Sequence, residues 1–181
     1  MIIGVPTETC QGERRVSIVP AGVSTLISMG CAVQVTAGAG QEAGFPDKTY
    51  EEVGAKISRD REAVFEESNV IAQVRGAGAN PDCGLADIER LSKEQLLVGF
   101  LEPLSAPAMI KALSDRYTTS CAMEFIPRTS RAQNMDALSS QANIAGYKAA
   151  LIAAEYLPRL FPMMMTAAGT ITPAHVFVIG A

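Results

Sequence analysis

The sequence contains no tryptophan, one histidine and four cysteines among its 181 residues. A histidine-rich metal site is therefore excluded, and a Ser-His-Asp triad would have to be built on His175 alone. The cysteines form no C-x-x-C pair and no secretory signal precedes them, so we expect reduced thiols in a cytosol-like compartment. We expect no metal site, and much hydrolytic chemistry is excluded.

The chain also lacks an excess of basic residues and an uninterrupted hydrophobic run. Fifteen Lys and Arg residues against 19 Asp and Glu residues give a net charge of −4, which disfavours nucleic acid as a partner. The most apolar stretch, residues 144–168, contains a lysine, a glutamate, an arginine and two prolines, which a bilayer span of about 20 residues would not carry. We therefore expect a soluble globular protein.

Short β-rich runs alternate with longer segments of helical period, which is typical of a parallel sheet with crossover helices. The expected strands are Ile2–Val5, Ala32–Thr36, Val70–Val74, Leu96–Leu101 and Thr118–Met123. The expected helices are Pro20–Met29, Asp47–Val53, Asp60–Glu66, Ala86–Leu91 and Ala106–Leu113. The pattern predicts an α/β fold, a Rossmann-like (flavodoxin-like) parallel sheet with flanking helices.

A long helical stretch begins near Met135 and meets no proline before Pro158. After a Met-rich turn, the apolar run 176–179 leads into Gly180, as in a dinucleotide site, where a buried strand precedes a glycine-rich turn. We therefore expect the start of a second Rossmann lobe, with an edge strand that ends the protein as the alternative. The expected division is an N-terminal α/β lobe over 1–134, a linking helix and connector over 135–174, and the truncated NAD-binding lobe over 175–181.

Three features of the N-terminal lobe have both a functional and a structural interpretation. The turn Gly38–Gly44 superficially resembles a phosphate-binding turn, but Pro46 interrupts the chain before a helix can start, which favours a structural turn. The run Glu13-Arg14-Arg15 follows the first strand, where ligands usually bind, or it is a solvated charge cluster. Arg75 and Glu102 at the ends of later strands have the same ambiguity.

The most polar segment, residues 127–143, precedes the long helix and combines two arginines with a glutamine, an aspartate and several hydroxyls. Asp136 can cap the helix and Ser139 can belong to its first turn, but a cap accounts for one residue only. The candidate side chains of this segment are Arg128, Arg131, Gln133, Asp136 and Ser139.

Three motifs of this part of the chain carry a family resemblance: PRTSRAQ at 127–133, DALSSQANIAGY at 136–147 and FPMMMTAAGT at 161–170. They resemble the NAD(H)-binding component, in the alpha subunit, of proton-translocating nicotinamide nucleotide transhydrogenase. The opening segments 4–6, 13–16 and 38–40 are similar both to that family and to alanine dehydrogenase. The resemblance covers nearly the whole chain.

The resemblance implies that NAD(H) binds mainly to the second lobe, across a cleft from the first. It implies that Arg128 and Ser139 donate to the nicotinamide carboxamide, while Gln133 and Asp136 hold the loop that fixes the ring for hydride transfer. Arg131 is expected to support this loop, and Gly180 to begin the dinucleotide turn. No side chain needs to act as an acid or base, because the cofactors carry the chemistry.

For the whole complex, the resemblance implies hydride transfer between NAD(H) and NADP(H), with NADP(H) on a separate component and proton movement through a membrane component. It further implies a homodimer and a cytoplasmic position, peripheral to the inner membrane through the complex, with the mitochondrial matrix side as the alternative. We expect the 181-residue chain alone to be inactive.

Two other functions stay open. The resemblance to alanine dehydrogenase implies a substrate site with an arginine at the place of Arg15, a lysine at about the place of Arg75 and a catalytic histidine at about the place of Glu102. This chain has neither the lysine nor the histidine, which favours transhydrogenase. The third reading is a non-catalytic, truncated dimerisation fragment.

Overall fold

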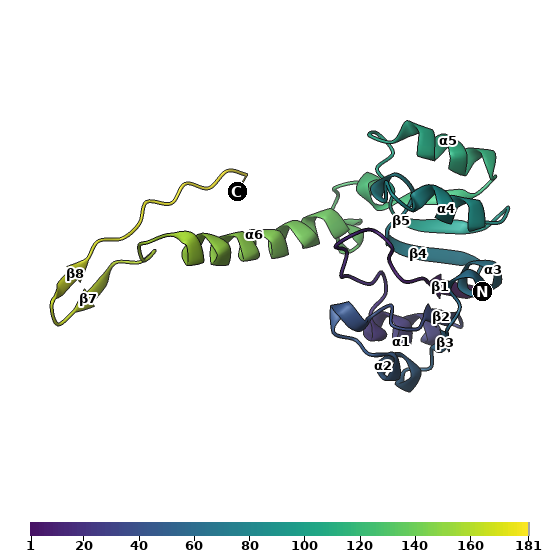
Figure 1. Ribbon diagram of the computed structural model, residues 1–181, viewed down its shortest axis with the longest axis horizontal. Helices are drawn as coiled ribbons and strands as arrows, with labels where there is room; N and C mark the ends of the chain where they lie inside the picture. The colour runs from purple at the N-terminus through teal and green to yellow at the C-terminus, as the bar shows by residue number, and fades with distance from the viewer. Residues whose placement is uncertain (181) are drawn as a thin grey trace. The chain divides into compact units, whose positions relative to one another are not determined.

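The first compact unit, Met1–Ala132, is built on a six-stranded parallel sheet in a computed structural model that describes residues 1–180 (Figure 1). The strands are β1 (Ile2–Val5), β2 (Ala32–Thr36), β3 (Lys56–Ser58), β4 (Val70–Arg75), β5 (Leu96–Phe100) and β6 (Thr119–Ala122). Their order is β3-β2-β1-β4-β5-β6, that of a doubly wound Rossmann sheet. The strand order reverses between β1 and β4, which makes this the switch point of the sheet.

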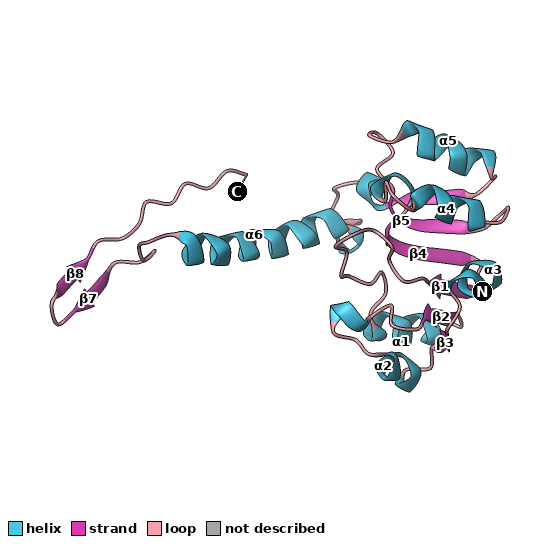
Figure 2. Ribbon diagram, viewed as in Figure 1, coloured by secondary structure: helices cyan, strands magenta, loops and turns pink. Residues whose placement is uncertain are grey.

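Helices connect successive strands and cover both faces of the sheet (Figure 2). They are α1 (Pro20–Ser28), α2 (Asp47–Glu52), α3 (Arg61–Glu67), α4 (Gly84–Arg90) and α5 (Pro107–Asp115), with short 3₁₀ turns at η1 (Gln41–Ala43), η2 (Ala77–Ala79) and η3 (Met123–Phe125). Right-handed crossovers place α1 and α2 on one face and α3, α4 and α5 on the other, because the direction of strand addition changes after β3.

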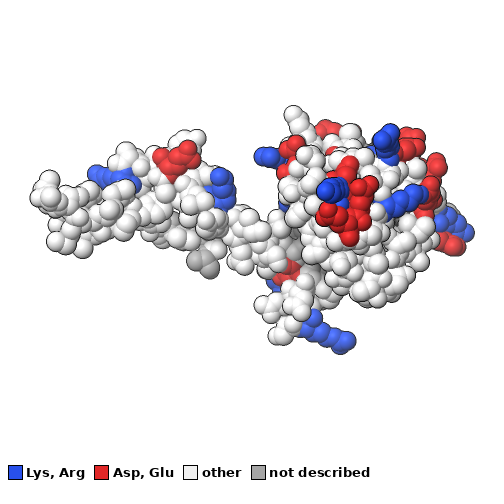
Figure 3. Space-filling view, turned by 90° about the horizontal axis from the view of Figure 1, so that it is seen from below, with Lys and Arg blue, Asp and Glu red and all other residues white. Residues whose placement is uncertain are grey.

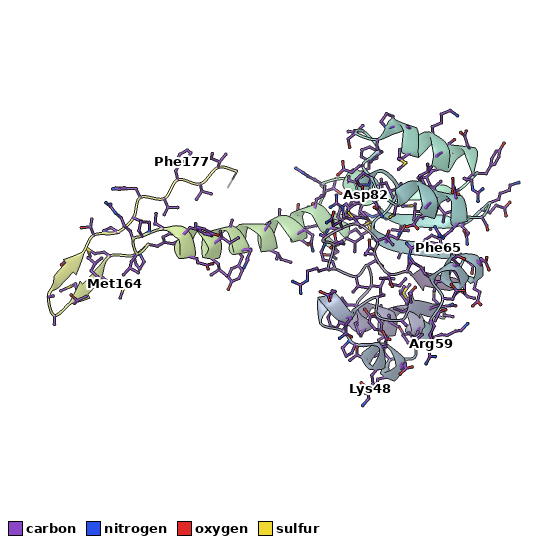
Figure 4. All side chains as sticks on the ribbon, in the orientation of Figure 1. Lys48, Arg59, Phe65, Asp82, Met164 and Phe177 are labelled. Carbon is purple, nitrogen blue, oxygen red and sulfur yellow. The ribbon has the colours of Figure 1, made fainter. Side chains whose placement is uncertain are left out.

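Two clusters of buried side chains form the core. Val23 of α1 and Tyr50 of α2 pack on Val35 and its neighbours in the first cluster. Phe65 of α3, labelled in Figure 4, packs with residues of β4, β5, α4 and α5 in the second. The strands next to the switch point are therefore buried on both faces, which explains their nearly continuous apolar sequence.

The expected Rossmann-like parallel sheet with flanking helices is confirmed, with one strand added. All five expected strands and the five expected helices of this unit are present within two residues of their expected ends. The sixth strand, β3, pairs with β2 from Gln34↔Lys56 to Thr36↔Ser58 and was not expected. Without it the order would be the 2-1-3-4-5 of flavodoxin-like sheets, so the short edge strand completes the Rossmann order.

The second compact unit, which begins at Gln133, contains η4 (Gln133–Met135), the 20-residue helix α6 (Ala137–Tyr156) and the antiparallel pair β7 (Met164–Thr166) and β8 (Gly169–Ile171). Asp136 caps α6, and Pro158 follows its C-cap, Leu157. The structure therefore confirms the expected long helix. The segment expected to be a Met-rich turn includes β7 and the start of β8.

The expected strand at 176–179 is not formed. A strand needs a neighbour for its backbone groups, and among the described residues no segment pairs with this one. Phe177 and Ile179 are both 89% exposed, and Figure 4 shows Phe177 on an irregular segment. Ala181, the last residue of the expected segment 175–181, lies outside the described residues.

Candidate functional site

The segment after β1 is held on the carboxyl end of β4, at the switch point where Rossmann sheets usually bind ligands. The Glu8 carboxylate accepts hydrogen bonds from the backbone amides of Val74, at 2.6 Å, and Arg75, at 3.1 Å. The Asn80 side-chain amide donates to the Thr9 hydroxyl at 2.8 Å. Side chains of the unit itself therefore occupy the amides at the end of β4.

An ion pair beneath this segment joins α3 to α4. The Arg61 guanidinium meets both carboxylate oxygens of Asp87, at 2.6 and 2.7 Å, and its Nε donates to the Thr7 carbonyl at 3.0 Å. Gln73 of β4 donates to the same carboxylate at 2.8 Å. Because Asp87 is buried, these donors compensate a charge removed from water.

Two carboxylates near the switch point, those of Glu8 and Glu13, have shifted pKa values. Burial raises the pKa of Glu8 above 4.5, and the amides of Val74 and Arg75 offset part of this change. The hydrogen bond from Arg15 lowers the pKa of Glu13 below 4.5. Burial has the larger effect on Glu8, whereas the arginine has the larger effect on Glu13.

The residues that an alanine dehydrogenase site would use make contacts within the first unit. Arg15 forms a two-point ion pair with Glu13, at 2.8 and 2.7 Å. Arg75 donates from Nε to the Ala79 carbonyl at 2.8 Å, and Glu102 accepts from the Ser105 hydroxyl at 2.8 Å. Each of these three side chains thus has a hydrogen-bond partner within four positions of itself in the sequence.

The turn Gly38–Gly44 has a structural role. The Gly38 amide donates to the Asp47 carboxylate at 2.8 Å, which holds the turn against the start of α2. A Cβ at Gly40 would lie 2.6 Å from the Phe45 carbonyl oxygen, so a side chain would not fit there. The turn contains η1 and is followed by Phe45 and Pro46, so it does not open directly into a helix that could bind a pyrophosphate.

The polar segment belongs to both compact units. Arg128 and Arg131 lie in the first unit, are exposed, and take part in no ion pair among the described residues. In the second unit, Gln133 begins η4, and the Asp136 carboxylate accepts from the Ser139 amide at 3.0 Å and from its hydroxyl at 2.6 Å. Of the candidates, the structure joins Asp136 and Ser139 by direct hydrogen bonds.

Gly180 and His175 both belong to the second unit. Gly180 is exposed, with a φ of 80° that glycine adopts at low cost. His175 is exposed as well. Among the residues that the structure describes, no group of His, Cys, Asp and Glu side chains could hold a metal ion, and no helix is long and apolar enough to cross a membrane.

Four buried or half-buried side chains, Glu8, Arg61, Asp87 and Glu124, were not singled out from the sequence. Their contacts join segments 14 to 67 positions apart, which no local pattern records. The position of Glu8 just after β1 was the one available signal, because carboxyl ends of parallel strands gather polar groups. Figure 3 shows acidic and basic side chains of the first unit lying side by side on one face.

Two family models match the chain. The model for the alanine dehydrogenase/PNT N-terminal domain matches residues 4–145, and the model for the alanine dehydrogenase/PNT C-terminal domain matches residues 149–181. The chain belongs to the alanine dehydrogenase/PNT family. The second match covers the region that we expected to lead into a further lobe.

Relatives within this family include transhydrogenases and alanine dehydrogenases. The chain is 39% identical to the NAD(P) transhydrogenase subunit alpha of Cereibacter sphaeroides over 100% of this chain and 34% of that protein. It is 33% identical to the alanine dehydrogenase of Mycobacterium tuberculosis, over 100% of this chain and 47% of that protein. The chain therefore spans about a third to a half of the length of these two relatives.

Solved structures of a transhydrogenase and of an alanine dehydrogenase are also similar to this chain. The transhydrogenase from Sinorhizobium meliloti superposes with a TM-score of 0.87 at 37% identity, over 96% of this chain and 50% of that one. An L-alanine dehydrogenase superposes with a TM-score of 0.64 at 28% identity, over 72% of this chain and 34% of that one. The fold of this chain is therefore that of the family.

Proposed function

We propose that the chain is part of the NAD(H)-binding component of a proton-translocating transhydrogenase. The observation that carries this proposal is the likeness to the S. meliloti transhydrogenase over 96% of the chain, with a TM-score of 0.87 against 0.64 for the alanine dehydrogenase. The whole complex would transfer hydride between NAD(H) and NADP(H), with NADP(H) on a separate component.

The exposed donors of the polar segment suit a nicotinamide cofactor. Arg128 is exposed and has no ion-pair partner among the described residues, so its guanidinium can donate to a carboxamide oxygen. The Ser139 hydroxyl donates to Asp136, so we propose that it accepts from the carboxamide amine instead of donating. Gln133 and Asp136 would fix the loop, with Arg131 supporting it.

The pyrophosphate requires a different site. Within the first unit, the turn Gly38–Gly44 is tied to Asp47 and offers no amides at a helix start. We therefore propose that the dinucleotide turn begins at Gly180, in a second Rossmann lobe that starts within 175–181 after the linking segment 135–174. When bound, the cofactor supplies the hydride, and the residues of this chain orient its nicotinamide ring.

The proposed partners follow from the transhydrogenase assignment. They are an NADP(H)-binding component, a membrane component that conducts protons, and a second copy of the chain. Several similar proteins are named as a subunit alpha, or a part of one, which supports the existence of partner subunits. The proposed location is the cytoplasmic face of the inner membrane, or the matrix face in mitochondria.

The decisive experiment measures turnover by the complete protein that carries this chain. One mixture contains L-alanine and NAD⁺, and the other contains NADH, an oxidised NAD analogue and an NADP(H)-binding partner. Hydride transfer in the second mixture alone would support the proposal. Alanine-dependent NAD⁺ reduction would overturn it in favour of an alanine dehydrogenase, even though Glu102 stands where that reading needs a histidine.

A binding measurement tests the reading of a non-catalytic dimerisation fragment. NADH affinity is compared between the 181-residue chain and the same chain extended to the length of its transhydrogenase relatives. Tighter binding by the extended protein would support the two-lobed cofactor site. Equal binding by both would contradict it.

A further inference from the structure

Two glutamates make the same kind of contact at the carboxyl ends of the neighbouring strands β4 and β5: each carboxylate accepts hydrogen bonds from two successive backbone amides. Glu8 accepts the amides of Val74 and Arg75 at the end of β4. Glu124 accepts the amides of Leu101 and Glu102 just beyond β5, both at Oε1 and both at 2.7 Å. Each carboxylate therefore ties the segment that follows one strand, β1 or β6, to the end of the neighbouring strand with which that strand pairs, β4 or β5.

Glu124 differs from Glu8 in what it is attached to. It lies in η3, directly after β6 and four positions before Arg128. At the other end of the same loop, Ala132 is 5% exposed and its amide donates to the Thr129 carbonyl at 3.0 Å. The loop is therefore held at its start by Glu124 and buried at Ala132, while Arg128 between them is exposed.

The contact is made under two unfavourable conditions. Glu102 has a φ of 51°, in the left-handed region that residues other than glycine rarely adopt. The Glu124 Oε2 is buried without a hydrogen-bond partner among the described residues, which costs free energy that an apolar side chain would avoid. A residue that served packing alone would not need a carboxylate here.

We propose that Glu124 is a positioning residue for the nicotinamide site. By holding the amides of Leu101 and Glu102, its carboxylate fixes the base of the loop that presents Arg128. This inference rests on the proposed function, because it assumes that Arg128 binds the nicotinamide carboxamide. Glu124 itself touches no cofactor atom in this proposal and acts through Arg128.

The test is a double-mutant cycle on the complete protein, with the dissociation constant of NADH measured by equilibrium fluorescence. Loss of a hydrogen bond from a charged donor predicts about tenfold weaker binding or more for Arg128→Ala. Displacement of the loop base predicts a similar loss of about tenfold for Glu124→Ala. In the double variant, Glu124→Ala adds no further loss, because the contact that it positions is already absent.

Two controls separate positioning from general stability. Glu124→Gln keeps a carbonyl oxygen for both amides and is expected to bind NADH within about threefold of the wild type. Glu8→Ala removes the carboxylate that accepts the amides at the end of β4. We expect it to lower the thermal midpoint and to leave NADH affinity unchanged, both in the wild type and in Arg128→Ala. If Glu124→Ala does not fold, Glu124→Asp takes its place in the cycle, because it shortens the reach to both amides.

The outcomes distinguish this inference from the proposed function. Additive losses in the double variant, or unchanged affinity in Glu124→Ala with weaker binding in Arg128→Ala, would overturn the positioning role and leave the cofactor site standing. Unchanged affinity in Arg128→Ala would overturn both the role of Arg128 and that of Glu124. Absence of hydride transfer in the wild type would contradict the proposed function itself.

Discussion

Individual carboxylates at the carboxyl edge of the sheet have opposite electrostatic surroundings. Glu8 is half-buried and faces backbone amides, with Glu13 and Arg61 as the charged groups that act on it, so burial raises its pKa. Glu13 is hydrogen-bonded to an arginine, which lowers its pKa. The two residues lie on one loop, but their pKa values are shifted in opposite directions.

The pKa of Glu8 predicts how it contributes to folding. Because the folded state binds the Glu8 proton more tightly than the unfolded chain, its contribution is present below pH 4.5 and is lost as the pH rises through the raised folded value. We expect the unfolding free energy of the wild type to fall relative to that of Glu8→Gln over this window. Denaturant titrations from about pH 3 to about pH 7 measure the difference.

Glu13→Gln serves as the control of opposite sign. The contribution of Glu13 is present above pH 4.5 and is lost as the pH falls through its lowered folded value. The wild type should therefore lose stability relative to this variant on acidification. Parallel pH profiles for the two variants would show that these surroundings do not determine the titration.

Gln133 offers a second prediction for a single residue. Gln133→Asn shortens the side chain by one methylene group, which would misplace the nicotinamide ring without removing the contacts that hold the cofactor. We expect NADH affinity of the complete protein to stay within about threefold while hydride transfer slows by about tenfold or more. Pre-steady-state hydride transfer measures the rate, and an unchanged rate would remove Gln133 from the site.

Among the elements, α3 and α4 are joined by the pair Arg61–Asp87, whose side chains are 19% and 4% exposed. Asp87→Ala would leave Arg61 and Gln73 without their shared acceptor in a region largely shielded from water. We expect a loss of about 3–5 kcal/mol in unfolding free energy. Denaturant unfolding of the 181-residue chain measures it.

The matched control is Asp115→Ala, which breaks the exposed pair with Lys111 on α5. An exposed i,i+4 pair of this kind contributes little, so the change should stay within about 0.5 kcal/mol. Equal losses for the two aspartate variants would mean that burial of the Arg61–Asp87 pair has no energetic consequence.

Elements with a strong local signal were predictable from the sequence, and elements that depend on distant partners were not. The α1 helix has Pro20 at its start and Gly30 after its end, both local signals. The β3 strand has three residues and is defined by its pairing with β2, so no period reveals it. Residues 176–179 have the composition of a strand, but among the described residues they lack the neighbour that makes one.

In the candidate site, too, features with a local sequence signal were predictable and contacts between distant residues were not. The polar composition of 127–143 is visible in the sequence, and so is the ability of Asp136 to cap α6, which the structure confirms. The anchoring by Glu124 was not visible, because its partners at Leu101 and Glu102 are more than 20 positions away. Local chemistry therefore indicated the loop, whereas the contacts that fix it required the fold.

For the whole molecule, the two compact units differ in how they are stabilised. The first unit contains both clusters of buried apolar side chains, whereas no residue of α6 in the second is buried. A chain of 132 residues is long enough to bury a core of its own.

We therefore expect a protein ending at Ala132 to fold cooperatively with a thermal midpoint within about 5 °C of that of the full chain. Calorimetry with circular dichroism measures both quantities. Loss of the cooperative transition would show that the sheet depends on the second unit. A protein of residues 133–181 is the complementary control and should show no such transition.

The hydrogen bonds of Glu8 also determine when, during synthesis, the start of the chain acquires its final form. Glu8 and Val74 are 66 positions apart. At a synthesis rate of about 5–20 residues per second, about 3–13 seconds pass between their additions. Throughout that interval the Glu8 carboxylate lacks the backbone amides that donate to it in the folded unit. The loop that follows the first strand is therefore made early and completed late, after the strand that supplies its amides has joined the sheet.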